Sequence, residues 1–199
     1  MSTIPTLEEQ IAMAGITYGR RHDISYRAGL VLQVLGAAVL AVLYPIESPF
    51  YTVGIMIFEL GVLISAIYLL VWISWIKKII LGSVFAGIAL QVAGMYVPEQ
   101  YAGRIMIAGI GLVCVGAAGM VGKEAYCFGY REGWLLMQVG FPVMVLANLL
   151  AKENHIFNAI GFSAVFLLLL SLVGKKLKQK LLSPCSQNVC GLPSQKTKS

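Results

Sequence analysis

Six long stretches of this chain contain no lysine, arginine or aspartate, and this pattern constrains the fold more than any other feature of the sequence. Each stretch has 18 or more residues, which is close to the ~20 residues that an α-helix needs to cross ~30 Å of hydrocarbon. Short charged connectors separate them. The stretches are Ala28–Ile46, Ser48–Ile76, Ile79–Pro98, Ile105–Gly122, Gly133–Ala151 and Ile156–Gly174.

The bulk composition agrees with a membrane protein. Charged residues make up 12% of the chain and the mean hydropathy is +0.81, whereas about a quarter of the residues in soluble proteins are charged. Because hydrocarbon offers no hydrogen-bond partner, each spanning segment must satisfy its own backbone, which favours helices. We therefore predict an all-α, polytopic membrane protein that forms a bundle of six transmembrane helices. The expected helices cover about residues 28–46, 50–76, 79–98, 105–122, 134–151 and 156–174, between an N-terminal arm (1–27) and a basic, disordered tail (175–199).

Lysine and arginine are distributed unevenly over the connectors. When the connectors are assigned alternately to the two sides, one side carries 13 of these residues and the other carries only Arg104 and Lys152. Loops rich in lysine and arginine stay on the cytoplasmic side of a membrane. Both termini are therefore predicted to be cytoplasmic. The net charge of +6 reflects this bias, and no nucleic-acid partner is indicated.

Small residues and one proline indicate how the helices pack. Inside lipid, glycine and alanine let helix backbones approach closely. They are concentrated in residues 79–98 and 105–122, which predicts that these two helices are central and closely packed. The helices expected at 50–76 and 156–174 are bulkier and would face lipid over more of their surface. Pro142 lies midway along the fifth helix and should kink it.

Glu59 is the only acidic residue inside the six stretches. An ionised carboxylate at that depth is costly, so Glu59 should be protonated, pair with a cation or line a wet cavity. One interpretation is a proton or ion site, and the other is a neutral side chain that is hydrogen-bonded to a neighbouring helix. The polar amides of the same stretches are expected to be buried and could join helices, ligate a pigment metal or face a substrate path. They are Gln33, Gln91, Gln138 and Asn148.

The connector after the fourth predicted helix holds the densest set of charged and reactive side chains. If that helix extends to about Phe128, Lys123 and Cys127 lie four residues apart on one face. Cations near a thiol lower its pKa, so a redox-sensing or modifiable cysteine is one interpretation. Anchoring of the loop to lipid headgroups and docking of a partner are the others. The docking or redox candidates are Lys123, Glu124, Tyr126, Cys127, Arg131 and Glu132.

The sequence indicates no resident cofactor and no metal site. A haem inside a membrane bundle needs axial ligands, commonly histidines, but His22 and His155 fall on opposite sides of the predicted bundle. Cys114 is expected to pack as a small apolar residue. Cys185 and Cys190 lack the two-residue spacing of zinc and thioredoxin motifs, and the sequence does not define their role. Binding of a pigment or a lipid stays open.

A resemblance to a known family rests on the same connector. The segments Gly109–Cys114 and Gly122–Gly129, followed by Glu132, resemble the uncharacterised integral-membrane family of cyanobacteria and plastids called domain of unknown function 2301. The specific part is the core Lys-Glu-Ala-aromatic-Cys-Phe in the second segment. Tyr26–Gly29 at the entry to the first helix also fits, so the likeness spans roughly residues 20–175. Asn148 stands where the family is expected to show a histidine. The resemblance implies a six-helix fold and a photosynthetic host. It supplies no catalytic residues, because the family carries no assigned activity.

These observations favour two classes of function. The first is an accessory, assembly or structural subunit of a larger membrane complex, for which a photosynthetic complex is one candidate. The alternative is a small proton- or ion-coupled transporter or channel that uses Glu59. An enzyme is not indicated, because no nucleophile–base pair and no metal-ligand spacing is present. The expected partners are membrane lipids and other membrane-protein subunits, in the thylakoid or plasma membrane of a photosynthetic organism.

Overall fold

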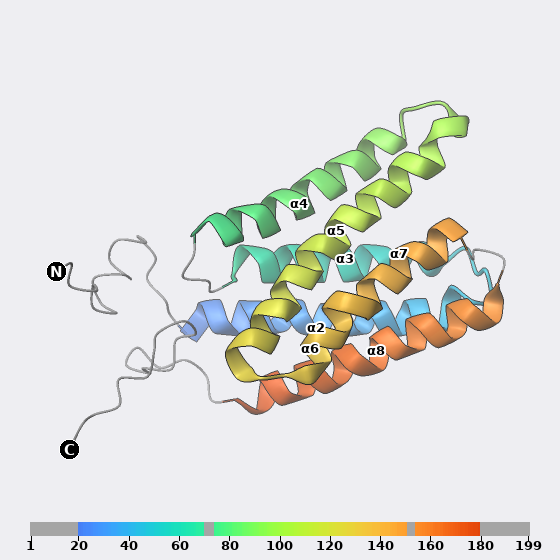
Figure 1. Ribbon diagram of the computed structural model, residues 1–199. Coiled ribbons are helices and arrows are strands. Elements are labelled where there is room, and N and C mark those ends of the chain that lie inside the picture. Colours follow the sequence, from blue (N-terminus) through green and yellow to red (C-terminus); the bar gives the residue numbers. More distant parts are fainter. Residues whose placement is uncertain (1–19, 70–73, 151–153, 180–199) are drawn as a thin grey trace, which may run out of the picture.

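The computed structural model describes residues 20–69, 74–150 and 154–179, and every regular element in these ranges is helical. The all-α prediction is confirmed for this part of the chain (Figure 1). The elements are α2 (Arg20–Leu43), α3 (Tyr51–Ile67), α4 (Ser74–Gly94), α5 (Glu99–Phe128), α6 (Arg131–Leu135), the π-helical segment η1 (Leu136–Gly140), α7 (Phe141–Leu150) and α8 (His155–Lys178).

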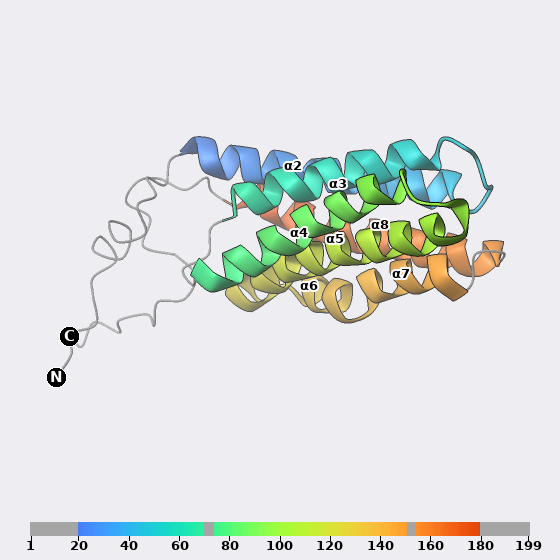
Figure 2. The ribbon, with the colours of Figure 1, turned by 90° about the horizontal axis from the view of Figure 1, so that it is seen from above.

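The helices run back and forth between the two ends of the bundle. The backbone stays helical through the junctions of α6, η1 and α7, so these elements form one continuous rod, and the described ranges contain six rods in all. Successive rods run in opposite directions (Figures 1 and 2). The start of α2 and the end of α8 therefore lie at the same end of the bundle. We call it the basic end, and we call the end where α4 meets α5 the far end.

Four helices are long and apolar enough to cross a membrane, namely α2, α4, α5 and α8. The longest is α5, with 30 residues, which corresponds to roughly 45 Å at about 1.5 Å per residue. Helix α3 is also apolar but has only 17 residues, and the rod from α6 to α7 is divided by its π-helical segment. This part of the chain is consistent with a multi-pass integral membrane protein.

Helices α2 and α3 approach so closely that their backbones touch. A Cβ atom at Gly36 would lie 2.4 Å from the backbone nitrogen of Phe58, and one at Gly61 would lie 2.7 Å from the carbonyl oxygen of Gly29. Only glycine fits at such positions, because any side chain would push the helices apart. The prediction of one helix over residues 50–76 was wrong, although large apolar side chains of α3 are exposed on its opposite face, as expected. Helix α3 ends at Ile67 and presents a glycine face to α2.

Helices α4 and α5 form a second pair built on glycine. A Cβ atom at Gly87 would lie 2.6 Å from the carbonyl oxygen of Gly109, and the reverse contact has the same distance. The predicted close packing of these helices is confirmed, but the prediction that both are central was wrong for α4. Only 22% of the residues in the apolar stretch of α4 are buried, against 50% for α2. The pair also diverges from α3 toward the far end (Figure 1), so much of α4 faces outward.

The backbone widens immediately before Pro142. Proline has no N–H group, and its ring clashes with the carbonyl group four residues earlier, here that of Gln138. The turn that contains this carbonyl, Leu136–Gly140, is π-helical. A wider turn moves the carbonyl group away from the proline ring. The kink predicted at Pro142 therefore takes the form of a π-helical segment.

Several predicted boundaries were wrong by one or two helical turns. Residues 20–27 belong to α2 rather than to the N-terminal arm, and α8 continues to Lys178 rather than ending at residue 174. Helix α5 covers Glu99–Phe128 rather than 105–122. Each extension is polar, and charged side chains can continue a helix past the hydrocarbon when they find partners. The rest of the predicted arm and tail, residues 1–19 and 180–199, lies outside the described residues.

The glycine contact between α2 and α3 predicts a sharp difference between two glycine-to-alanine substitutions. The Cβ atom of Gly36→Ala would meet rigid backbone of α3, so we expect a loss of about 1–3 kcal/mol of stability. Gly82→Ala in α4 is the matched control, because no atom lies within 4 Å of its Cβ position and alanine favours a helix by up to ~1 kcal/mol. Thermal unfolding of the detergent-solubilised variants measures both effects. Equal melting temperatures would show that α2 and α3 do not touch.

Candidate functional site

The end of α5 carries the charged connector into the interior of the bundle. Gly129 has a left-handed backbone with φ of 69° and donates its N–H to the carbonyl oxygen of Ala125, which ends the helix at Phe128. Glycine adopts this conformation without a steric penalty. Lys123 and Glu124 therefore lie in the last turns of α5, as the sequence predicted for a helix that reaches Phe128. Glu124 is completely buried, with 0% of its surface exposed.

Glu124 joins three helices at the basic end. The hydroxyl group of Tyr26 in α2 donates a hydrogen bond to Oε1 of Glu124 over 2.9 Å. The ammonium group of Lys123, in the same helix as Glu124, lies 3.0 Å from Oε1, and that of Lys176 in α8 lies 2.8 Å from Oε2. Hydrogen bonds to charged groups are among the stronger ones in proteins. This carboxylate thus holds α2, α5 and α8 together.

Two aromatic rings complete this group. The Nζ atom of Lys176 lies 4.2 Å from the centre of the Phe128 ring, and Nζ of Lys123 lies 5.5 Å from it. Both ammonium groups also lie 5.8 Å from the ring centre of Tyr26. Cation–π contacts of this kind stabilise a buried ammonium group by about 0.5–2 kcal/mol. We call Tyr26, Lys123, Glu124, Phe128 and Lys176 the Glu124 cluster.

An ion pair within α2 flanks the cluster. Arg27 binds Asp23 one turn earlier, with Nη2 of Arg27 2.9 Å from Oδ2 of Asp23 and Nε 3.1 Å from Oδ1. Nη1 of Arg27 also donates to the carbonyl oxygens of Leu177 and Gln179, over 3.4 and 2.8 Å. These carbonyl groups belong to the end of α8, where no helical N–H group remains to bind them. Arg27 therefore caps α8 from α2.

A second ion pair lies between α6 and α8. Lys175 Nζ lies 2.5 Å from Oε1 of Glu132, and the Ser171 hydroxyl donates to the same oxygen over 2.9 Å. The pKa of Glu132 is lowered to about 2, and the hydrogen bond from Lys175 is the main cause. Burial raises the pKa of Tyr130, whose hydroxyl oxygen accepts a hydrogen bond from Gln179. The basic end is closed by charge pairs between neighbouring helices.

The docking and redox candidates divide into two groups. The first group forms ion pairs within the protein and consists of Lys123, Glu124 and Glu132. The second group is exposed and consists of Tyr126, which is 78% exposed, and Arg131. Cys127 is half-buried and disulfide-bonded, so it carries no free thiol in this structure. The nearest ammonium group along the helix, that of Lys123, is directed to Glu124.

The other predicted polar residues fall in the middle of the bundle. Gln33 is completely buried, and its amide donates to Ser65 Oγ over 3.1 Å and to the Gly61 carbonyl oxygen over 3.4 Å. Gln91 donates to Oε1 of Glu59 over 2.5 Å, which links α4 to α3. Both amides join helices, one of the roles that the sequence left open.

For Gln138 the prediction was wrong, and for Asn148 it stays untested. Gln138 is exposed on the outer surface of η1, so the expectation that it is buried was wrong. The π-helical turn changes which residues face the interior, since it adds a residue to one turn of the helix. Asn148 lies in α7, but its side chain is outside the described residues, as are Cys185 and Cys190. Cys114 is a free, buried cysteine, as predicted.

Only two of the five residues of the Glu124 cluster, Lys123 and Glu124, were predicted from the sequence as site residues. Lys176 was assigned to the tail as one of several basic residues, and Tyr26 was noted only at the entry to the first helix. Asp23 and Arg27 were assigned to the arm, although their spacing of four residues is typical of an ion pair on one face of a helix. That spacing was the one signal in the sequence that α2 begins before residue 28.

The comparisons with known proteins add no constraint on this site. No family model, no curated protein and no solved structure matches the chain. The resemblance to the domain of unknown function 2301 therefore stays a prediction that rests on the segments quoted above.

The position of Glu124 predicts a large effect of removing its charge. In Glu124→Gln the ammonium groups of Lys123 and Lys176 lose the carboxylate that binds them in the described part of the chain, and breaking a buried ion pair in this way costs about 3–5 kcal/mol. Thermal unfolding in a neutral detergent measures the loss. Tyr126→Phe is the control, because it removes an exposed hydroxyl group two residues away and should leave the melting temperature unchanged. Similar melting of the two variants would contradict the structure of the cluster.

Proposed function

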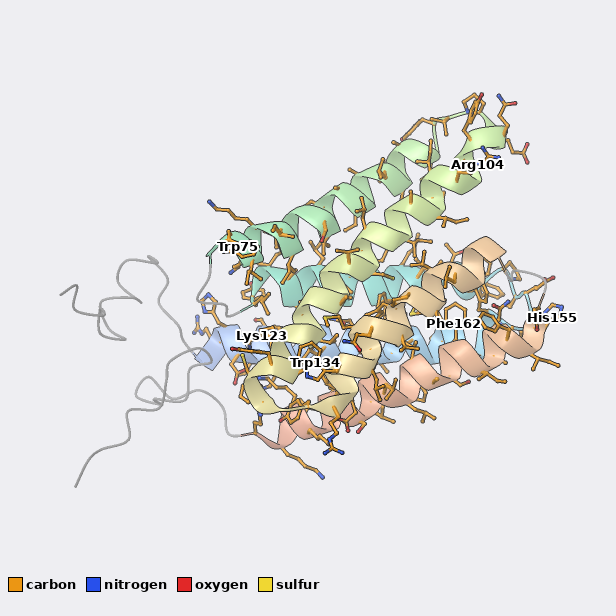
Figure 3. All side chains as sticks on the ribbon, viewed as in Figure 1. Trp75, Arg104, Lys123, Trp134, His155 and Phe162 are labelled. Atoms are coloured by element: carbon orange, nitrogen blue, oxygen red, sulfur yellow. The ribbon has the colours of Figure 1, made fainter. Side chains whose placement is uncertain are left out.

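We propose that the chain crosses the membrane six times, with both termini on the cytoplasmic or stromal side. The alternating direction of the six rods supports this arrangement (Figures 1 and 2). The distribution of charge supports the orientation, since Lys123 lies at the basic end and Arg104 at the far end (Figure 3). Together with the resemblance quoted above, this favours the thylakoid or plasma membrane of a photosynthetic organism.

We propose that the protein is an accessory, assembly or structural subunit of a larger membrane complex. The observation that carries this proposal is that polar side chains inside the bundle bind one another across helix boundaries. Gln33 binds Ser65, Glu59 binds Gln91, and Glu124 binds Lys176. Contacts of this kind fix the helices relative to one another, which suits a scaffold. Backbone contact between glycines in both helix pairs adds to the same rigidity.

The surface that fits a partner lies at the basic end. Tyr126 and Arg131 are exposed there, together with Trp134 at the start of the following rod. Tyrosine, tryptophan and arginine are the residues that most often dominate protein–protein interfaces. Glu124 and Lys123, by contrast, are occupied inside the protein. The outward half of the connector is therefore the proposed docking surface.

Affinity purification tests this surface. The protein is tagged at its C-terminus and extracted in mild detergent, and proteins that co-purify in stoichiometric amounts are identified by mass spectrometry. Tyr126→Ser with Arg131→Gln should reduce the amount of co-purified partner subunits at least tenfold, because two interface residues are lost. The control is Tyr101→Ser with Arg104→Gln, which changes an exposed tyrosine and arginine at the far end of the same helix. Equal retention in both double variants would contradict docking at Tyr126 and Arg131.

One observation supports the alternative, a proton- or ion-coupled transporter or channel. The carboxyl group of Glu59 is hydrogen-bonded to the neutral amide of Gln91, and it forms no ion pair with a cation in residues 20–69, 74–150 and 154–179. A carboxyl group without a counter-charge in lipid favours the protonated form. Such a group can exchange a proton.

Liposomes containing the purified protein test this alternative. If Glu59 transfers protons, the wild-type protein should dissipate an imposed pH gradient, and Glu59→Gln should reduce that rate to the rate of empty liposomes. Glutamine keeps the size of the side chain and can still bind Gln91, so the fold is retained. Equal proton fluxes for wild-type protein, Glu59→Gln and empty liposomes would leave Glu59 with a structural role.

A further inference from the structure

The Glu124 cluster contains more positive than negative charge. Lys123 and Lys176 share the single carboxylate of Glu124. Asp23 also attracts the ammonium group of Lys176, but the charge of Asp23 is balanced by Arg27 and that of Glu132 by Lys175. Each of those pairs is neutral by itself. Among residues 20–69, 74–150 and 154–179, the cluster therefore carries a surplus of one positive charge.

This surplus lies in a place where charge is costly. The side chain of Lys176 is 7% exposed and that of Lys123 is 14% exposed, so water solvates both ammonium groups poorly. The rings of Tyr26 and Phe128 supply partial negative charge at their faces, but they carry no net charge. A buried charge without a counter-ion is strongly unfavourable. An anion that reached the cluster would therefore be bound tightly.

The more exposed ammonium group gives the anion its point of entry. The side chain of Lys123 is partly exposed, and the cluster lies at the basic end, as the position of Lys123 shows (Figure 3). An ammonium group has three N–H donors, of which Lys123 uses one for Glu124. The remaining donors can bind an anionic oxygen.

We propose that the Glu124 cluster binds a phosphate group through Lys123 and Lys176, with Glu124 holding the two ammonium groups in place. A phosphate monoanion or diester carries the one negative charge that the cluster lacks. It can come from the headgroup of an anionic phospholipid or from free phosphate in solution. This site is independent of the proposed docking surface, which uses the outward residues Tyr126 and Arg131. Its place at the level of lipid headgroups rests on the proposed six-span topology.

The test uses the full-length protein, stripped of lipid in a neutral detergent. Mixed micelles with phosphatidylglycerol supply the anionic headgroup, those with phosphatidylcholine supply a zwitterionic one, and sodium phosphate supplies the free anion. Binding is followed by the rise in melting temperature with probe concentration and by native mass spectrometry. The wild-type protein should bind phosphatidylglycerol with saturation at one site per chain, and phosphatidylcholine should give no comparable shift.

Two lysine variants distinguish this site from general attraction of a basic surface to anionic lipid. Lys123→Gln leaves a neutral pair of Lys176 and Glu124, so the protein should fold, but its apparent affinity for phosphatidylglycerol should fall about tenfold or more. Lys178→Gln removes an exposed charge from the end of α8 and should keep the wild-type affinity within about twofold. Equal losses in the two variants would overturn the proposal.

A third variant should increase the stabilisation by phosphatidylglycerol rather than reduce it. Glu124→Gln raises the surplus from one to two positive charges, so phosphatidylglycerol should raise its melting temperature more than that of the wild-type protein. If this variant does not fold, the comparison of Lys123→Gln with Lys178→Gln still tests whether the Glu124 cluster binds phosphate. The site binds free phosphate if sodium phosphate stabilises the protein as much as phosphatidylglycerol does and if this stabilisation requires Lys123. Stabilisation by phosphatidylglycerol alone assigns it to lipid.

The acidic residues of the N-terminal segment provide the last control. Glu8 and Glu9 lie outside the described residues, and their carboxylates could fill the same site. If they do, Glu8→Gln with Glu9→Gln should create binding of phosphatidylglycerol that the wild-type protein lacks, and this result would overturn the proposal. Unchanged binding in this double variant supports it.

Discussion

The carboxylate of Glu124 is the contact that joins both helix pairs to α8 at the basic end. Two pairs of helices, α2 with α3 and α4 with α5, are each held together by backbone contact at glycines. Such contacts fix a pair internally but do not determine how the pairs sit relative to each other. Glu124 belongs to α5 and binds Tyr26 in α2 and Lys176 in α8. It therefore connects both pairs to the helix that closes the bundle.

Glycine contacts and charge pairs stabilise different parts of the molecule for a physical reason. In hydrocarbon an ion pair must repay the loss of hydration, and its net contribution to stability is small or negative. Close backbone contact requires no desolvation of charge, which suits the middle of the helices. The ion pairs Arg27–Asp23 and Lys175–Glu132 instead lie at the basic end, where water and headgroups are near.

The sequence predicted the helical class and the packing of α4 against α5, because both depend on local composition. It did not predict the partners of Lys176, which lies far from Glu124 along the chain and whose charge could equally mark the end of a membrane span. The helix ends were misplaced for the same reason, since Arg27 and Asp23 continue α2 only because they bind each other and the end of α8. The position of Gln138 was wrong because a π-helical turn shifts the helical pattern before Pro142.

The connector at the end of α5 combines an inward and an outward face in very few residues. An α-helix turns about 100° per residue, so Glu124 and Phe128, four residues apart, lie on one face, and Tyr126 lies on nearly the opposite one. The inward face holds the helices together and the outward face stays accessible. A short charged segment of this kind can therefore be constrained by packing and by partner binding at the same time. Substitutions at Tyr126 and at Glu124 separate the two requirements, because neither residue contributes to the face of the other.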